Sequence, residues 1–206
     1  MPRADRGYGR RKRLLDVVVA LGGFALLLPL LLLLVLAVKL DSPGPAFFVH
    51  ERVGLRGRRF KMIKLRTMSA DAAARHDVLH RAAGLSGPVF KLRDDPRITR
   101  VGRWLRRWSV DEAPQLLNVL RGEMSLVGPR PLPPDQTDPD DERFATRTQV
   151  PPGLTGQWQI TGRLMHVDYD RWLAQDCWYV EHRSFGLDLA ILARTLPAVL
   201  RGEGAW

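Results

Sequence analysis

The chain has 206 residues, which is enough for one compact domain with an attachment and too short for two large domains. It carries 32 lysine and arginine residues against 22 aspartate and glutamate residues, a net charge of +10. That balance predicts an anionic partner, whether nucleic acid, an acidic membrane surface or a phosphorylated substrate. The single cysteine, Cys177, excludes an intramolecular disulfide and gives no sign of an oxidising compartment.

Residues 17–38 form an apolar run of 22 residues without a charged side chain. A helix of about 20 apolar residues crosses the hydrocarbon core of a bilayer. The run is too long for the apolar part of a cleaved signal peptide, and no small-residue cleavage site follows it. We therefore expect residues 1–40 to form a basic tail and a membrane-embedded helix, and residues 41–206 to form a separate domain.

Positive charge lies on both sides of this run, and positive charge marks the cytoplasmic side of a membrane segment. A spanning helix would place one flank outside, whereas a re-entrant helix that bends at Pro29 keeps both flanks inside. A spanning helix with a tolerated proline is the alternative. The charges are Arg3, Arg6, Arg10, Arg11, Lys12 and Arg13 before the run, and Lys39, Arg52, Arg56, Arg58, Arg59, Lys61, Lys64 and Arg66 after it.

Two short strands are predicted after the membrane segment. Residues 40–48 contain turn residues followed by a strand-like run, and residues 57–68 alternate apolar and basic side chains. Together they indicate a short β-hairpin, and a polar helix is expected over residues 69–83. His76 and His80 have the spacing of a metal pair on that helix, but a solvated helix face is the favoured interpretation.

Residues 97–108 read as an amphipathic helix. Apolar Val101, Trp104 and Leu105 lie on one side of it and arginines on the other, which suits a helix in a membrane interface. Packing of the same apolar side on the protein's own core is the alternative.

Further elements follow this helix along the chain. An exposed, mobile acidic loop is expected at residues 131–142, and a loop or hairpin at residues 151–163. Helices are expected near 168–183 and 187–201. The predicted fold class is thus α+β and mainly helical, with interfacial amphipathic helices and a short β-hairpin.

The stretch SVDEAPQL at residues 109–116 contains two adjacent carboxylates. Ser109 and Glu112 fit a capping box at the start of a helix that continues to Gly122. A carboxylate fixed beside arginines would also suit a nucleophile or a Mg²⁺ ligand in phosphoryl chemistry. Arg130, flanked by two prolines, would suit bidentate phosphate recognition or a rigid structural turn.

Four motifs together resemble one family. They are KRLLDVVVALGGFALLLPLLLLL, DSPGPAFFVHERVGLRGRRFKMIKLRTM, DPRITRVGRWLRRWSVDEAPQLLNVLRGEMSLVGPRP and PPGLTGQWQITGR. The chain is similar over residues 12–206 to the bacterial sugar transferases, the monotopic phosphoglycosyl transferases that act on polyprenyl phosphate. It resembles the minimal catalytic unit of that family, with residues 41–206 as a cytoplasmic catalytic domain.

The resemblance implies transfer of a sugar 1-phosphate from a nucleoside-diphosphate sugar, usually a UDP-sugar, to undecaprenyl phosphate with release of UMP. Asp111 matches the family's nucleophile, which forms a covalent phosphosugar intermediate, and Glu112 completes an Asp-Glu pair. Mg²⁺ is the implied cofactor, with Asp111 as a ligand. Arg106 and Arg130 match phosphate- and nucleotide-binding positions. Lys64 and Arg66 are further candidates for phosphate binding.

The family's membrane helix is re-entrant and usually broken at a Ser-Pro pair. Here Pro29 is present but Leu28 stands in place of the serine, which removes a hydroxyl that could satisfy carbonyls freed at the bend. The implied location is the cytoplasmic face of the bacterial inner membrane, in contact with its lipids. The resemblance leaves formation of a homodimer as an open alternative.

Two other classes of protein fit the charge: a membrane-tethered nucleic-acid-binding protein and a non-catalytic membrane scaffold. Neither explains the acidic pair or the proline-flanked Arg130, and no known nucleic-acid motif is present. The sequence therefore favours an enzyme without a nucleic-acid partner. It does not identify the sugar or the glycan pathway.

Overall fold

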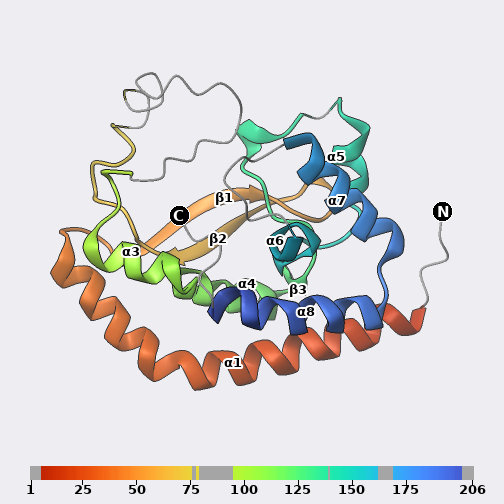
Figure 1. The fold of residues 1–206 in the computed structure, drawn as a ribbon, viewed down its shortest axis with the longest axis horizontal. Coiled ribbons are helices and arrows are strands. Elements are labelled where there is room, and N and C mark those ends of the chain that lie inside the picture. Colours follow the sequence, from red (N-terminus) through yellow and green to blue (C-terminus); the bar gives the residue numbers. More distant parts are fainter. Residues whose placement is uncertain (1–5, 76–77, 79–94, 139, 162–168, 201–206) are drawn as a thin grey trace.

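A computed structural model describes residues 6–75, 78, 95–138, 140–161 and 169–200, and its fold is mainly helical α+β as predicted (Figure 1). The helices are α1 (Arg6–Asp41), α3 (Arg100–Arg107), α4 (Leu116–Arg121), α5 (Glu142–Arg147), α6 (Gln157–Thr161), α7 (Tyr169–His182) and α8 (Phe185–Leu200). The strands are β1 (Phe47–Val53), β2 (Arg59–Leu65), β3 (Ser125–Val127) and β4 (Gly153–Thr155). Short 3₁₀ helices are η1 (Leu55–Gly57), η2 (Val110–Gln115) and η3 (Pro134–Gln136).

Helix α1 contains the predicted apolar run and is, among the described residues, the one helix long and apolar enough to cross a membrane. It continues through Pro29 as one uninterrupted helix. Figure 1 shows it curving beneath the rest of the domain rather than projecting from it. One side of α1 packs on the domain through residues such as Ala20, Leu31 and Val38.

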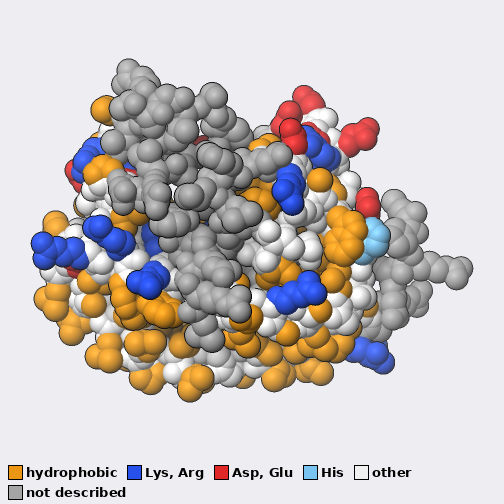
Figure 2. Space-filling model, viewed as in Figure 1, with side chains coloured by type: hydrophobic (Ala, Val, Ile, Leu, Met, Phe, Trp, Pro, Cys, Tyr) orange, Lys and Arg blue, Asp and Glu red, His pale blue; other side chains and the backbone are white. Residues whose placement is uncertain are grey.

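The opposite side of α1 leaves an extended apolar surface exposed. Figure 2 shows these hydrophobic side chains gathered along the edge of the molecule that α1 and α8 form. An exposed apolar patch of this kind marks a surface that contacts a membrane or another protein. The exposed large side chains on the two helices are Leu14, Val18, Val19, Leu21, Leu26, Leu28, Leu30, Leu32, Leu33, Leu36, Leu40, Leu189 and Leu196.

Polar contacts attach the N-terminal part of α1 to the domain. The buried Asp188 of α8 accepts hydrogen bonds from Tyr8 Oη at 2.9 Å and Lys12 Nζ at 3.0 Å. The buried Asp16 accepts the backbone N–H of Leu126 at 3.0 Å. Arg13 donates to the last carbonyls of α4, at 2.6 and 2.7 Å. These buried groups hold one end of α1 against α4, β3 and α8.

The C-terminal end of α1 is attached to the domain as well. Asp41 Oδ2 accepts the backbone N–H of Val101 at 2.9 Å. Arg66 is 7% exposed and donates to the carbonyls of Pro43 at 2.7 Å and Ser42 at 2.6 Å, with a longer contact to Val38. The carbonyls at a helix C-terminus lack intrahelical partners, and a guanidinium satisfies them well. The geometry gives Arg66 this structural role, and the phosphate contact expected from the sequence stays a prediction.

The predicted β-hairpin is confirmed. Strands β1 and β2 pair antiparallel, with Phe47 opposite Leu65 and Val53 opposite Arg59. The chain reverses at η1, where Arg56 and Gly57 both have positive φ angles. The buried Phe60 and Met62 of β2 join the main core, which also contains side chains of α1, α4, α7 and α8.

A second, parallel strand pair was not predicted. Residues 151–163 were expected to form a loop or hairpin, but β4 pairs with β3, with Ser125 opposite Gly153, and α6 follows. Glycine is required here because a Cβ on Gly153 would lie 2.1 Å from the backbone nitrogen of Gly128. The pairing brings the segment after β3, which carries Arg130, against the segment that begins β4.

Other expectations were met in part. Helices α7 and α8 agree with the predicted C-terminal helices, whereas residues 70–75 form turns and the rest of the expected helix at 69–83 lies mostly outside the described residues. His76 and His80 also lie outside them. The acidic loop at residues 131–142 is not uniformly exposed, because Leu132 is 1% exposed and packs with Phe144 and Trp172.

Candidate active site

The acidic pair lies on η2, directly after α3. The predicted capping box is wrong: Ser109 has a left-handed backbone (φ 53°), and its side chain makes no capping hydrogen bond. Only its carbonyl takes part, accepting the N–H of Glu112 at 3.2 Å. The following α-helix begins at Leu116 rather than at the carboxylates. The carboxylates are therefore positioned by the turn itself and by what packs on it.

Asp111 is buried, with 7% of its surface exposed, and strand β2 packs against η2. Burial, together with the negative charge of Glu112, raises the pKa of Asp111 from 3.8 to about 6, and the positive charges of Lys64, Arg106 and Arg130 oppose this rise. Four predicted site residues thus act electrostatically on Asp111, namely Glu112, Lys64, Arg106 and Arg130. Cations that favour the ionised form of a buried carboxylate keep it available as a nucleophile or metal ligand.

Arg106 reaches this centre from α3. Its Nε donates to Thr67 Oγ1 at 2.9 Å, which fixes the guanidinium near the end of β2. Helix α3 lies close to that strand because Gly102 has no side chain; a Cβ there would lie 2.1 Å from the carbonyl oxygen of Thr67. Thr99 caps α3 by accepting the N–H of Gly102 at 3.0 Å.

The two interpretations of α3 each hold for part of the helix. Leu105 is fully buried against α1 and Leu65, as expected for packing on the core. Trp104 is 48% exposed, as expected for an interfacial helix. One helix thus joins the protein core to a surface that carries a large aromatic side chain and arginines.

Arg130 approaches the acidic pair from the loop after β3. Its Nη2 lies 3.2 Å from Glu112 Oε1. Its backbone carbonyl accepts a 2.6 Å hydrogen bond from Arg147 Nη2, and Arg147 is itself paired with Asp176 at 2.6 Å. Arg147 and Asp176 are both buried, so this ion pair holds the Arg130 backbone from behind.

Lys64 lies on β2, opposite Phe48 of β1. Burial lowers the pKa of Lys64, and the adjacent Glu112 opposes that effect. Arg52 on β1 is a further cation of the site, and the sequence analysis counted it only as a flanking charge. Its Nη1 donates to the carbonyl of Pro131 at 3.3 Å, and burial together with the charge of Arg130 lowers its pKa to about 9. Strand alternation was the signal that could have placed Arg52 on the same face of the hairpin as Lys64.

The donor set fits a hard divalent cation. Mg²⁺ is usually held by one or two carboxylates together with substrate phosphates and water. Asp111 and Glu112 supply two carboxylates in sequence, with the first buried and partly neutralised by cations. Among the described residues no group of three or more His, Cys, Asp or Glu side chains could hold a metal. A metal here would therefore complete its coordination with oxygens of the substrate.

Comparison with known proteins agrees with this chemistry. The chain is 46% identical over 206 residues to a UDP-glucose:undecaprenyl-phosphate glucose-1-phosphate transferase of Caulobacter vibrioides, covering 95% of this chain and 72% of the relative. It is 40% identical to the exopolysaccharide production protein ExoY of Rhizobium meliloti, covering 96% of this chain and 89% of the relative. It is also 40% identical to an undecaprenyl-phosphate galactose phosphotransferase of Salmonella typhimurium, covering 98% of this chain and 43% of the relative.

Several curated relatives are longer than this chain, which spans only 41–43% of their length. The family match nevertheless covers nearly all of the present sequence, since the family described as "Bacterial sugar transferase" matches residues 8–202. This range includes all but the first two residues of α1, both strand pairs and every residue of the candidate site. The chain belongs to the bacterial sugar transferase family.

Proposed function

We propose that the protein transfers a sugar 1-phosphate from a UDP-sugar to undecaprenyl phosphate and releases UMP. The observation that carries this proposal is the buried carboxylate of Asp111, on which the positive charges of Lys64, Arg106 and Arg130 act. The names of the relatives, which include glucose and galactose phosphotransferases acting on undecaprenyl phosphate, support the same reaction. Such a product would begin a lipid-linked glycan or an exopolysaccharide.

In the first step an ionised Asp111 oxygen attacks the β-phosphorus of the donor. A new phosphorus–oxygen bond forms to Asp111, and the bond between that phosphorus and the bridging oxygen breaks, so UMP leaves with the electron pair. In the second step a phosphate oxygen of undecaprenyl phosphate attacks the same phosphorus and returns Asp111 to a carboxylate. The surrounding cations stabilise negative charge that shifts onto the phosphoryl oxygens during both steps.

Mg²⁺ is proposed as the cofactor, held by Asp111 and Glu112 together with the donor's diphosphate. When bound it would neutralise charge on the diphosphate and on the departing UMP. Arg130 then has two tasks in this chain: its guanidinium orients Glu112 from 3.2 Å, and it offers further donors to a phosphate.

We also propose that α1 lies in one leaflet and returns to the cytoplasmic face. The support is the attachment of both its ends to one domain, through Asp188 near Tyr8 and through Arg66 near Ser42. The apolar surface of α1 and α8 would then rest in the acyl region, with Asp111 near the headgroups where a lipid phosphate arrives. The proposed location is the cytoplasmic face of the bacterial inner membrane.

Release of UMP by the purified protein tests the reaction. The protein in detergent is mixed with undecaprenyl phosphate, Mg²⁺ and a panel of UDP-sugars, and one UDP-sugar should give acceptor-dependent UMP. Without acceptor, a donor labelled in the sugar should leave label on Asp111, located by peptide mapping. A nucleic-acid-binding protein or a scaffold would release no UMP from any donor, and that result would refute the proposal.

A further inference from the structure

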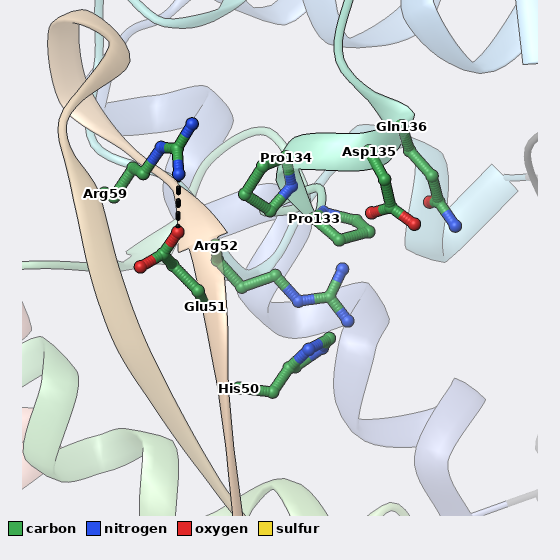
Figure 3. Close-up of a pocket in the computed structure, with 8 residues that line it drawn as sticks. All are labelled: His50, Glu51, Arg52, Arg59, Pro133, Pro134, Asp135 and Gln136. Atoms are coloured by element: carbon green, nitrogen blue, oxygen red, sulfur yellow. Dashed lines mark hydrogen bonds and ion pairs between the residues drawn. The ribbon is translucent and has the colours of Figure 1, made fainter. Parts of the chain in front are cut away.

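A solvent-open pocket of about 520 Å³ lies beside the candidate site and takes no part in the proposed chemistry (Figure 3). Its volume falls within the range of about 300–1,000 Å³ that is usual for small-molecule sites. One wall is β1 and the other is the segment around η3. The lining residues that matter for its chemistry are His50, Arg52, Pro133, Pro134, Asp135 and Gln136.

Arg52 connects the pocket with the acidic pair. In Figure 3 its guanidinium extends between His50 and the segment that carries Pro133 and Asp135. Its Nη1 donates to the carbonyl of the residue that follows Arg130, and the charges of Arg130 and Glu112 both act on it. A phosphate held near Arg130 would therefore be within the influence of Arg52 as well.

The hairpin register points the same way. His50 pairs with Met62, Arg52 with Phe60, and Lys64 with Phe48. Residues directly opposite each other share a face of the sheet, and alternate residues of a strand share a face. His50 and Arg52, which line the pocket, thus project from the same face of the hairpin as Lys64, which acts on Asp111.

The pocket combines a cation with flat and polar groups. The Arg52 guanidinium extends toward the segment with the flat rings of Pro133 and Pro134 and the polar side chains of Asp135 and Gln136, and the ion pair of Glu51 and Arg59 also lines the pocket. Burial, with the charges of Arg52 and Lys64, lowers the pKa of His50 to about 4, so its ring is neutral near pH 7. A nucleoside monophosphate offers groups that match this lining: an anionic phosphate, a hydroxyl-bearing ribose and a flat neutral base.

We propose that this pocket binds the nucleoside of the donor, with the α-phosphate at Arg52, the base against Pro133 and Pro134, and Asp135 and Gln136 accepting and donating hydrogen bonds to the ribose or base. The inference rests on the proposed function, which supplies the UDP-sugar. Strand β1 extends away from α1 (Figure 1), so the nucleotide and the lipid acceptor would reach Asp111 from different sides.

Titration calorimetry with UMP and with inorganic phosphate tests this, using the full chain in detergent. Asp135→Ala and Gln136→Ala each remove a contact to the nucleoside, and Asp135→Ala should weaken UMP binding about tenfold or more, the effect of losing one charge-assisted hydrogen bond. Phosphate binding should not weaken, because Asp135 places negative charge near Arg52. The matched control is Asp140→Ala, an exposed carboxylate of the same acidic loop outside the pocket, which should bind UMP like wild type.

Equal UMP affinity in wild type and both pocket variants would overturn the inference, as would wild-type protein that binds UMP no more tightly than phosphate. Thermal unfolding of each variant identifies loss of binding through misfolding. If Asp135→Ala is misfolded, the UMP affinity of Gln136→Ala decides the test. If UMP binding depends on Asp135 but no UDP-sugar yields UMP, the proposed function fails and the nucleotide site stands. If turnover occurs while UMP binding ignores both substitutions, the function stands and this site fails.

Discussion

Replacing Asp111 by asparagine is expected to abolish transfer and, at the same time, to stabilise the fold. The pKa of Asp111 is raised from 3.8 to about 6 because the side chain is buried beside Glu112. A carboxyl whose pKa is higher in the folded state than in the unfolded state favours folding when protonated. Its ionisation therefore destabilises the fold as the pH rises from the unfolded pKa to the folded pKa, and the full penalty remains above about pH 6.

The size of the penalty follows from the shift. About two pKa units at about 1.4 kcal/mol each give about 3 kcal/mol near neutral pH. Asparagine has nearly the same shape and no charge, but its buried amide donors would cost about 1 kcal/mol if they remain unpaired. The net stabilisation expected for Asp111→Asn is about 2 kcal/mol, or a rise in Tm of about 4–8 °C for a chain of this length.

Thermal unfolding of both proteins across about pH 4 to 8, in one detergent and with EDTA present, measures this difference. At about pH 4 Asp111 is protonated in the folded state and the ionisation penalty is nearly gone, so the variant should be about 1 kcal/mol less stable than wild type because of its amide donors. The difference should reverse as the pH rises. UMP release by the variant should fall by several orders of magnitude, with deamidation excluded by mass spectrometry. A variant that is less stable than wild type near neutral pH, or one that still turns over, would refute the assignment.

Three further predictions follow from the site and from α1. Arg130→Lys keeps the charge but loses the bidentate fork, so kcat/KM should fall about tenfold or more; wild-type kinetics would mean that Arg130 supplies only positive potential. Asp176→Asn leaves the buried guanidinium behind Arg130 without its counter-ion and should lower the free energy of unfolding by about 3 kcal/mol, measured by denaturant titration; an unchanged midpoint would contradict the buried pair. Asp5→Cys and Arg56→Cys, each in a Cys177→Ser background, should both resist a membrane-impermeant thiol reagent on intact cells, whereas labelling of one alone would establish a spanning helix.

The sequence predicted the elements whose signal is local. The apolar run of α1, the alternation in β2 and the helical periodicity of α7 and α8 each depend on residues that are close together in the chain. Each of these patterns reports which side of an element is buried. The second strand of the hairpin and the C-terminal helices were accordingly predicted near their observed bounds, whereas the first strand begins only at Phe47, at the end of the segment 40–48 in which it was expected.

The capping box failed because tertiary contacts determine the backbone at Ser109. The spacing of Ser109 and Glu112 is that of a capping box, but Ser109 adopts a left-handed conformation and a 3₁₀ turn follows. A non-glycine residue in this region is held there by its surroundings, at a cost of about 1–3 kcal/mol. Here the turn directs Asp111 toward β2, and no local pattern encodes the position of that strand.

The parallel pair of β3 and β4 was missed for a related reason. Each strand has three residues, and the two are separated by α5 and the acidic loop. A strand this short has too few residues for alternation to be recognised. The visible trace is glycine at Gly128, Gly153 and Gly156, where the two backbones approach closely. The sequence analysis took residues 151–163, which contain Gly153 and Gly156, as a loop or hairpin, although these glycines mark contact between segments.

Arg52 and Arg66 show why charge in the sequence does not assign function. Both flank the membrane segment and both are largely covered in the fold. Arg66 donates from Nη1 and Nη2 to the carbonyls of Pro43 and Ser42, so it stabilises the end of α1. Arg52 instead faces another cation, Arg130, and this repulsion contributes to lowering its pKa. The groups around each guanidinium distinguish the structural role of Arg66 from the role of Arg52 in the candidate site. The sequence alone does not show which groups surround each side chain.

The candidate site brings several groups of like charge close together, and these groups repel one another. Arg52, Lys64, Arg106 and Arg130 gather around two carboxylates, Asp111 and Glu112, so these six groups carry a surplus of two positive charges when both carboxylates are ionised. Such an arrangement costs stability in the free protein, because the cations repel one another and the buried nucleophile is reluctant to ionise. A diphosphate brings two negative charges into the same place. Donor binding would therefore relieve the repulsion among the cations, so the charges that lower the stability of the free protein are those that hold and activate the substrate.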